Sequence, residues 1–203
     1  MLNNNLCIRI GVLGSTRGTI LPFIIESINN GILKGLVEIV VCISNKKDSG
    51  ILEKAKNQNI KASYIPVYKN ETREVYDNKI NDELLLNKID LVICIGWMRI
   101  LSKTFTEKWK NSCMNVHPSL LPDFAGGMDI NVHQSVLDAK KKKTGCTIHM
   151  ITDIVDGGSI IIQKECKVLI NDNAETLKNR VQKLECEAYI EAILKWKNNN
   201  AFI

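Results

Sequence analysis

The chain has 203 residues, of which 45% are hydrophobic and 5% aromatic, and its mean hydropathy is close to zero. This length and apolar content are sufficient for one large or two small globular domains. No apolar stretch is long enough to cross a bilayer, and residues 1–9 lack the charged start and long apolar core of a signal peptide. We therefore expect a globular protein without membrane partners.

The charged residues and cysteines exclude further classes. The net charge of +5 comes from 27 Lys and Arg against 22 Asp and Glu, spread along the chain. A nucleic-acid surface needs clustered cations and stacking aromatic side chains, so we expect small-molecule partners, with a mildly positive field that suits anions. The seven cysteines are odd in number and contain no Cys-x-x-Cys pair, which argues against a disulfide framework or zinc site and indicates a reducing cytoplasm.

The first part of the chain alternates apolar strands with helices. The predicted strands are residues 6–13, 36–43, 63–67, 90–95 and 112–116, and the predicted helices are residues 19–29, 50–58 and 73–86. Continuous apolar strands separated by helices are typical of a parallel sheet that is covered on both faces.

The pattern changes after residue 131. A helix is predicted at 131–139, two strands at 147–152 and 159–168, and a closing helix at 174–195. The short connection between the two strands suits an antiparallel pair, and Asn171, Asp172 or Asn173 can cap the last helix. Because no repeat or linker interrupts the chain, we expect a single α/β domain over residues 1–203 with a mixed sheet.

The turn after the first strand, Gly14 to Thr19, is a candidate phosphate site. It offers free backbone N–H groups, hydroxyls and the positive end of a helix. It matches neither a Walker A loop nor a GxGxxG fingerprint, so a nucleoside triphosphate or dinucleotide is not indicated. An ordinary strand-to-helix turn remains the alternative.

Two further segments can carry acyl-transfer chemistry. Asn115 and His117 alternate at a strand end, so both side chains can face one pocket and hold an oxyanion. Asp156 precedes two glycines that permit close backbone approach, and its carboxylate can fix the tautomer of His117 and favour the protonated ring. Taken singly, each residue is more simply structural, so this interpretation requires Asp156 to reach His117.

The remaining histidines have simpler interpretations. His149 lies on a predicted strand and reads as a buried core residue, and His133 reads as a structural or surface residue of a helix. Without a cluster of cysteines or carboxylates at ligand spacing, no metal site is expected. Lys140 to Lys143 reads as a solvated helix end.

Together these segments resemble the folate-dependent formyltransferase family, and most closely its members that act on glycinamide ribonucleotide. The resemblance spans nearly the whole chain. Its strongest strings are Gly-Trp-Met-Arg-Ile-Leu-Ser (96–102), Asn-Val-His-Pro-Ser-Leu-Leu-Pro (115–122), Thr-Gly-Cys-Thr-Ile-His (144–149), Asp-Gly-Gly (156–158) and Arg-Val-Gln (180–182). It implies a Rossmann-like formyltransferase fold and a monomer or homodimer.

The resemblance also implies substrates and roles. The donor would be 10-formyltetrahydrofolate, the acceptor would be the amine of glycinamide ribonucleotide, and no metal would be needed. Asn115 and His117 would stabilise the oxyanion, while Asp156 would tune His117 and proton transfer. The implied nucleotide contacts are Arg17, Gly18, Thr19, Ile20, Gln182 and Glu185. The implied folate contacts are Arg73, Met98, Arg99, Ile100, Leu101, Thr152, Asp153, Ile154 and Val155.

Two departures from the family pattern stand out. The phosphate turn has Thr16, Arg17 and Ile20 where Gly and Asn are common, which leaves backbone contacts possible but changes the side-chain contacts. The segment Asp123 to Asp129 replaces a common Tyr-Pro-Gly and is slightly longer, so it can reshape the edge of the pocket.

Three alternatives stay open. A methionyl-tRNA formyltransferase shares the donor but carries an added C-terminal domain and tends to lack a histidine at position 149. A formyltetrahydrofolate deformylase has an N-terminal regulatory domain, whereas the first strand is expected at once here. A folate- or nucleotide-binding module without catalysis would not need Asn115, His117 and Asp156 together.

Overall fold

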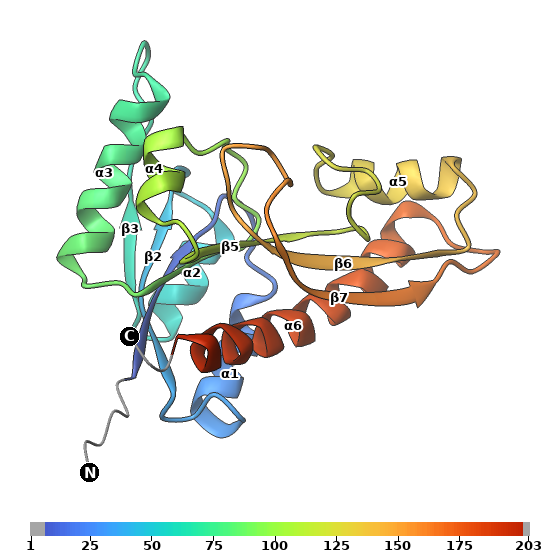
Figure 1. Cartoon of the computed structure of the whole chain (residues 1–203), viewed down its shortest axis with the longest axis horizontal. Coiled ribbons are helices and arrows are strands. Elements are labelled where there is room, and N and C mark those ends of the chain that lie inside the picture. Colours follow the sequence, from blue (N-terminus) through green and yellow to red (C-terminus); the bar gives the residue numbers. More distant parts are fainter. Residues whose placement is uncertain (1–6, 201–203) are drawn as a thin grey trace.

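A mixed sheet of seven strands runs through the middle of the molecule (Figure 1). The structure is a computed structural model that describes residues 7–200. The strand order is β3-β2-β1-β4-β5-β6-β7; the neighbours from β3 to β5 pair in parallel, and β6 is antiparallel to both β5 and β7. This confirms the predicted Rossmann-like sheet with an antiparallel C-terminal part.

The elements follow the predicted order. The strands are β1 (Ile8–Leu13), β2 (Val37–Ser44), β3 (Lys61–Tyr64), β4 (Leu91–Cys94), β5 (Cys113–His117), β6 (Lys143–Met150) and β7 (Ile160–Lys167). The helices are α1 (Leu21–Asn30), α2 (Gly50–Asn57), α3 (Arg73–Leu86), α4 (Lys103–Lys108), α5 (Ile130–Asp138) and α6 (Ala174–Asn199).

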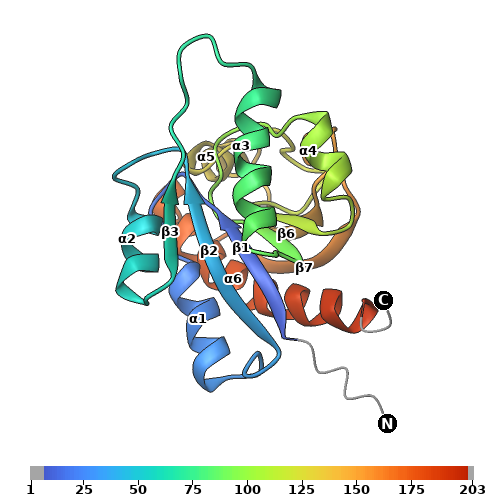
Figure 2. The same cartoon turned by 90° about the vertical axis from the view of Figure 1, so that its left-hand side faces the viewer.

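Helices cover both faces of the sheet, as predicted (Figure 2). Successive residues of a strand point to opposite faces, so one buried strand supplies both cores. Ile93 packs in the core that includes α1, α2 and α6, whereas its neighbours Val92 and Cys94 pack in the core that includes α3 and α4. This double burial explains why β4 is apolar throughout.

Several predicted bounds were wrong in detail: β3 covers Lys61–Tyr64 instead of 63–67, and α6 continues to Asn199 instead of ending at 195. Helix α4 was not predicted, because it has only six residues and depends on a local N-cap, in which the Ser102 hydroxyl accepts the N–H of Phe105. Strand β6 begins at Lys143, four residues before the predicted start at Thr147, because Lys143 and Thr144 pair with β7 despite their polarity. Leu6, the predicted start of the first strand, lies outside the described residues.

The carboxyl ends of β1 and β4 are joined where the strand order reverses. Ser15, directly after β1, donates its backbone N–H to the carbonyl of Gly96 at 3.0 Å. Its hydroxyl accepts the N–H of Met98 at 3.1 Å and donates to the Asn45 side chain at 2.7 Å. In open α/β sheets, ligands collect at such a reversal, so this edge is where a site is expected.

Helix α6 is fixed by a capping box at its first turn. The Asn173 side chain accepts the N–H groups of Glu175 and Thr176 at 3.0 and 2.9 Å, and the Thr176 hydroxyl accepts the N–H of Asn173. Of the three predicted caps, Asn173 is therefore the N-cap. Among residues 7–200, no helix combines the length and apolarity needed to cross a bilayer.

We predict that Asn173→Ala lowers the free energy of unfolding by about 1 kcal/mol, because it removes the acceptor of two helix N–H groups. Chemical denaturation measures this change. Asn171→Ala is the matched control, since this exposed neighbour takes no part in the capping box. An equal loss in both variants would show that the cap contributes nothing specific.

Candidate active site

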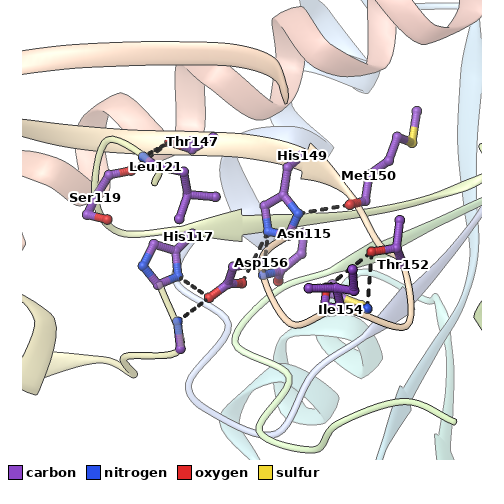
Figure 3. A network of polar contacts seen from close by, with 12 residues as sticks. Asn115, His117, Ser119, Leu121, Thr147, His149, Met150, Thr152, Ile154 and Asp156 are labelled. Atoms are coloured by element: carbon purple, nitrogen blue, oxygen red, sulfur yellow. Dashed lines mark hydrogen bonds and ion pairs between the residues drawn. The ribbon is translucent and has the colours of Figure 1, made fainter. Parts of the chain in front are cut away.

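The carboxylate of Asp156 is the centre of a polar cluster (Figure 3). One oxygen lies 3.2 Å from His117 Nδ1 and accepts the backbone N–H of Gly126 at 2.8 Å. The other oxygen lies 3.4 Å from His149 Nε2. Its side chain is only 9% exposed, so these three groups are its main neighbours.

Strand pairing places the amide and the two rings together. Asn115 and His117 alternate on β5, and both line the same cavity, as the sequence predicts. The antiparallel register places His149 of β6 opposite Asn115, and Asn115 Nδ2 lies 3.3 Å from His149 Nε2. His149 is a buried strand residue, as predicted, but it also lines this cavity beside Asp156, which the prediction missed.

The loop between β6 and β7 carries Asp156 back to the strands. Asp156 itself adopts a positive φ of 54°, so the unusual torsion lies on the aspartate, and neither Gly157 nor Gly158 has a positive φ. A Cβ at Gly158 would lie 1.8 Å from the Met150 carbonyl, so only glycine fits there. The close approach expected of the Asp-Gly-Gly string is confirmed at Gly158.

The environment keeps Asp156 ionised. Burial alone raises the pKa of this carboxyl, but hydrogen bonds from His117, His149 and the Gly126 N–H lower it by more, so its pKa lies well below the ordinary value. His117 in turn faces acceptors on both sides, because its Nε2 lies 3.0 Å from the Phe124 carbonyl. Only the doubly protonated ring can donate to both acceptors, so this arrangement suits an imidazolium ion beside the Asp156 carboxylate.

A first chamber with a cavity volume of about 160 Å³ opens beside this cluster. Many predicted folate contacts line it: Met98, Arg99, Ile100, Leu101, Thr152, Ile154 and Val155. Arg73 and Asp153 are not among the lining residues, so the structure does not bring these two to the cavity.

A second chamber with a cavity volume of about 140 Å³ lies at the carboxyl ends of β1 and β4. All six predicted nucleotide contacts line it: Arg17, Gly18, Thr19, Ile20, Gln182 and Glu185. The backbone N–H groups of residues 16–20 donate to no other residue within the described part of the chain, and Gly18 has a positive φ of 62°. Such N–H groups before α1 can hold an anion, with Arg17 supplying positive charge.

One face of α6 supplies polar groups to the second chamber. Lys178, Gln182 and Glu185 follow helical spacing and all line it. Glu185 is buried, and this burial raises its pKa to about 7, with Lys178 opposing the shift. Burial lowers the pKa of His133 to about 4, assisted by the charge of Lys178, so His133 is a neutral ring at physiological pH.

Three lining residues escaped sequence reasoning. His149 depends on the β5–β6 register, which the chain does not reveal by itself. His133 is 1% exposed and lines the second chamber, where its Nδ1 has no partner within residues 7–200. Lys178 could have been found, because it lies four residues before Gln182 on the same helical face.

The segment from Asp123 to Asp129 contributes directly to the cluster. Its Phe124 carbonyl contacts His117, and its Gly126 N–H binds Asp156. The expectation that this segment forms the edge of the pocket is therefore correct but incomplete. Within residues 7–200, no three His, Cys, Asp or Glu side chains gather as ligands for a metal ion.

We predict that the protein loses stability as pH rises from about 4.5 to about 7 through Glu185. The folded pKa of about 7 lies above the ordinary glutamate pKa of 4.5, so the neutral carboxyl favours folding below pH 4.5, and that contribution is lost as pH rises through the folded pKa. Glu185→Gln should lack this decline in unfolding free energy. Glu107→Gln, on exposed α4, should keep the wild-type slope; identical slopes in all three proteins would contradict the assignment.

Similarity to known proteins agrees with this geometry. Residues 8–193 match the formyl transferase family. Phosphoribosylglycinamide formyltransferase from Haemophilus influenzae is 33% identical over 189 residues, which cover 93% of this chain and 86% of that protein. The trifunctional purine biosynthetic protein adenosine-3 of Bos taurus is 39% identical over 187 residues. The chain spans between 13% and 18% of the length of such trifunctional relatives.

Solved structures give the same result. Glycinamide ribonucleotide transformylase 1 from Symbiobacterium toebii superposes with a TM-score of 0.86 at 33% identity, over 95% of this chain and 87% of that one. The phosphoribosylglycinamide formyltransferase from Coxiella burnetii, in complex with CHES, gives 0.85 at 32% identity, over 94% and 87%. The chain therefore belongs to the formyl transferase family, among its phosphoribosylglycinamide formyltransferase members.

Proposed function

We propose that this chain transfers the formyl group of 10-formyltetrahydrofolate to the amine of glycinamide ribonucleotide in purine biosynthesis. The observation that carries the proposal is the Asp156 carboxylate held 3.2 Å from His117 Nδ1, beside Asn115, in a wall of the first chamber. Family membership supports the reaction, and the adjoining second chamber supports a phosphorylated acceptor.

The donor is assigned to the first chamber. Met98, Ile100, Leu101, Ile154 and Val155 give it an apolar wall, which suits a flat folate ring. Arg99 lies over the Tyr76 ring at 4.6 Å, and this contact positions the arginine at the chamber wall. Arg73 and Asp153 remain predictions that rest on the family resemblance alone.

The acceptor is assigned to the second chamber. Its phosphate binds the free N–H groups of residues 16–20, with Arg17 beside them. Gln182 and Glu185 offer hydrogen-bonding groups for the sugar. Both chambers share Gly96 and Val116 in their linings, so the amine and the formyl carbon meet at this junction.

The transfer begins when the neutral amine attacks the formyl carbon. A nitrogen–carbon bond forms, and the carbonyl electrons move onto oxygen. Asn115 donates a hydrogen bond to this oxyanion, and the N–H at His117 Nε2 exchanges the Phe124 carbonyl for the same oxygen. Asp156 stabilises the imidazolium through this change.

The tetrahedral intermediate then collapses toward product. The proton of the attacking nitrogen passes to the departing folate nitrogen through a water held by Asp156, and the bond from the carbon to that nitrogen breaks. The proton count balances without a base outside the site. Tetrahydrofolate and the formylated amide leave, and the protein returns to its starting protonation state.

Product analysis separates the alternatives. Donor mixed with glycinamide ribonucleotide yields the formylated nucleotide if the proposal holds. Formate from donor alone would indicate a deformylase, methionyl-tRNA as the only acceptor would indicate that other transferase, and no product would indicate a binding module. The second chamber, with its anion-binding turn, favours the nucleotide acceptor.

The compartment and assembly also belong to this proposal. All seven cysteines are free, which supports a reducing cytoplasm. The chain acts as one catalytic domain over residues 1–203, as a monomer or homodimer, on small-molecule substrates.

We predict that Asp156→Asn lowers kcat by ~10²-fold or more, because the neutral amide no longer stabilises the His117 cation or holds the transfer water. Steady-state kinetics with saturating donor measure the loss. Asp138→Asn, an exposed position on α5, is the control and should retain wild-type turnover. Near-normal kcat in Asp156→Asn would remove this carboxylate from the mechanism.

A second prediction separates chemistry from binding. His117→Ala should abolish turnover but leave the affinity for the folate largely intact, because this residue contributes only part of one wall of the first chamber. Calorimetric titration with tetrahydrofolate measures the binding. If folate affinity and turnover fall together in a variant that stays folded, His117 has a structural role instead.

A further inference from the structure

The junction between the two chambers carries one charged side chain among its shared lining residues. Five residues line both chambers: Gly96, Met98, Val116, Pro118 and Asp129. Only Asp129 among them is ionisable. It belongs to the segment from Asp123 to Asp129, whose backbone also contacts His117 and Asp156.

The side chain of Asp129 does not cap the helix that follows it. Asp129 occupies the N-cap position of α5, but its side chain accepts no N–H from that helix. Its φ of 49° and ψ of −134° are unusual for a residue other than glycine. A normal aspartate cap would bind the first turn, so this carboxylate is directed elsewhere at some conformational cost.

Lys178 holds the carboxylate in its place. The ammonium of Lys178, on α6, pairs with Oδ1 of Asp129 across the second chamber. The other oxygen, Oδ2, accepts no hydrogen bond from the described residues, and the Asp129 side chain is 52% exposed. One oxygen is thus anchored while the second is free for a ligand.

Asp129 lies at the wall that the two chambers share. Burial lowers the pKa of His133 and the charge of Asp129 opposes that shift, whereas burial raises the pKa of Glu185 and the charge of Asp129 adds to that shift. The phosphate turn lines the second chamber and the Asp156 cluster lines the first, so a carboxylate at their shared wall lies between the assigned acceptor and donor sites.

We propose that the free oxygen of Asp129 accepts an N–H of the attacking acceptor amine. This inference rests on the proposed function. The bond turns the amine lone pair toward the formyl carbon, and it stabilises the positive charge that develops on nitrogen as the nitrogen–carbon bond forms. Lys178 offsets part of the carboxylate charge, so the site does not simply retain the amine as an unreactive ammonium ion.

The first test replaces the charge but keeps the shape. Asp129→Asn should lower kcat for glycinamide ribonucleotide about 10-fold, with a smaller change in the KM for either substrate, because the interaction grows in the transition state. Asp123→Asn is the matched control: this aspartate lies on the same segment and pairs with Lys141, but lines neither chamber. It should retain wild-type kinetics.

A charge reversal separates this role from a purely structural ion pair. In the double variant Asp129→Lys with Lys178→Asp, the ion pair can re-form, but the carboxylate is moved from the junction. We expect kcat to stay at or below that of Asp129→Asn. Recovery toward wild-type kcat would show that the pair only anchors the segment, and would overturn the proposal.

The outcomes also distinguish this inference from the proposed function. An active wild type with an unaffected Asp129→Asn would overturn only the role of Asp129. A wild type that does not formylate glycinamide ribonucleotide would overturn both. Thermal unfolding of each variant identifies any loss that is due to misfolding, and Asp129→Ser then provides a second neutral replacement.

Discussion

The site depends on a buried carboxylate that cannot be left unpaired. An ion removed from water costs several kcal/mol unless charges and hydrogen bonds replace its hydration shell. Asp156 receives these from the rings of His117 and His149 and from the Gly126 N–H. Each donor comes from a different element. The contacts that stabilise this one anion therefore connect β5, β6 and two loops.

Strand direction explains how these donors meet. A purely parallel sheet would bring only strand ends together, and successive ends would lie at one edge. Because β6 runs antiparallel to β5, His149 lies beside Asn115 within the sheet and its ring still reaches Asp156. The reversal after β5 therefore places a polar cluster in the wall of the first chamber, at the open edge of a Rossmann-like sheet.

The sequence predicts the features that depend on local patterns. Helix α3 begins and ends at the predicted residues, and the phosphate turn and the Asn115–His117 pair line the expected cavities. Features that depend on partners escaped prediction. Strand β6 begins four residues before its predicted start because β7 pairs with its polar first residues. His149 reaches the site through the β5–β6 pairing register, which the pattern of apolar residues in the sequence does not reveal.

The segment from Asp123 to Asp129 shows why the same scaffold can vary its chemistry. Its Phe124 carbonyl contacts His117, and its Gly126 N–H binds Asp156. Both contacts are made by backbone atoms, so they do not depend on which side chains the segment carries. The strand residues are constrained by burial on both faces, whereas this segment has to satisfy only those backbone contacts. In the mechanism that we propose, the Phe124 carbonyl holds the His117 N–H until the formyl oxygen replaces it. A change in the length of this segment can therefore alter the timing of oxyanion stabilisation without disturbing the sheet.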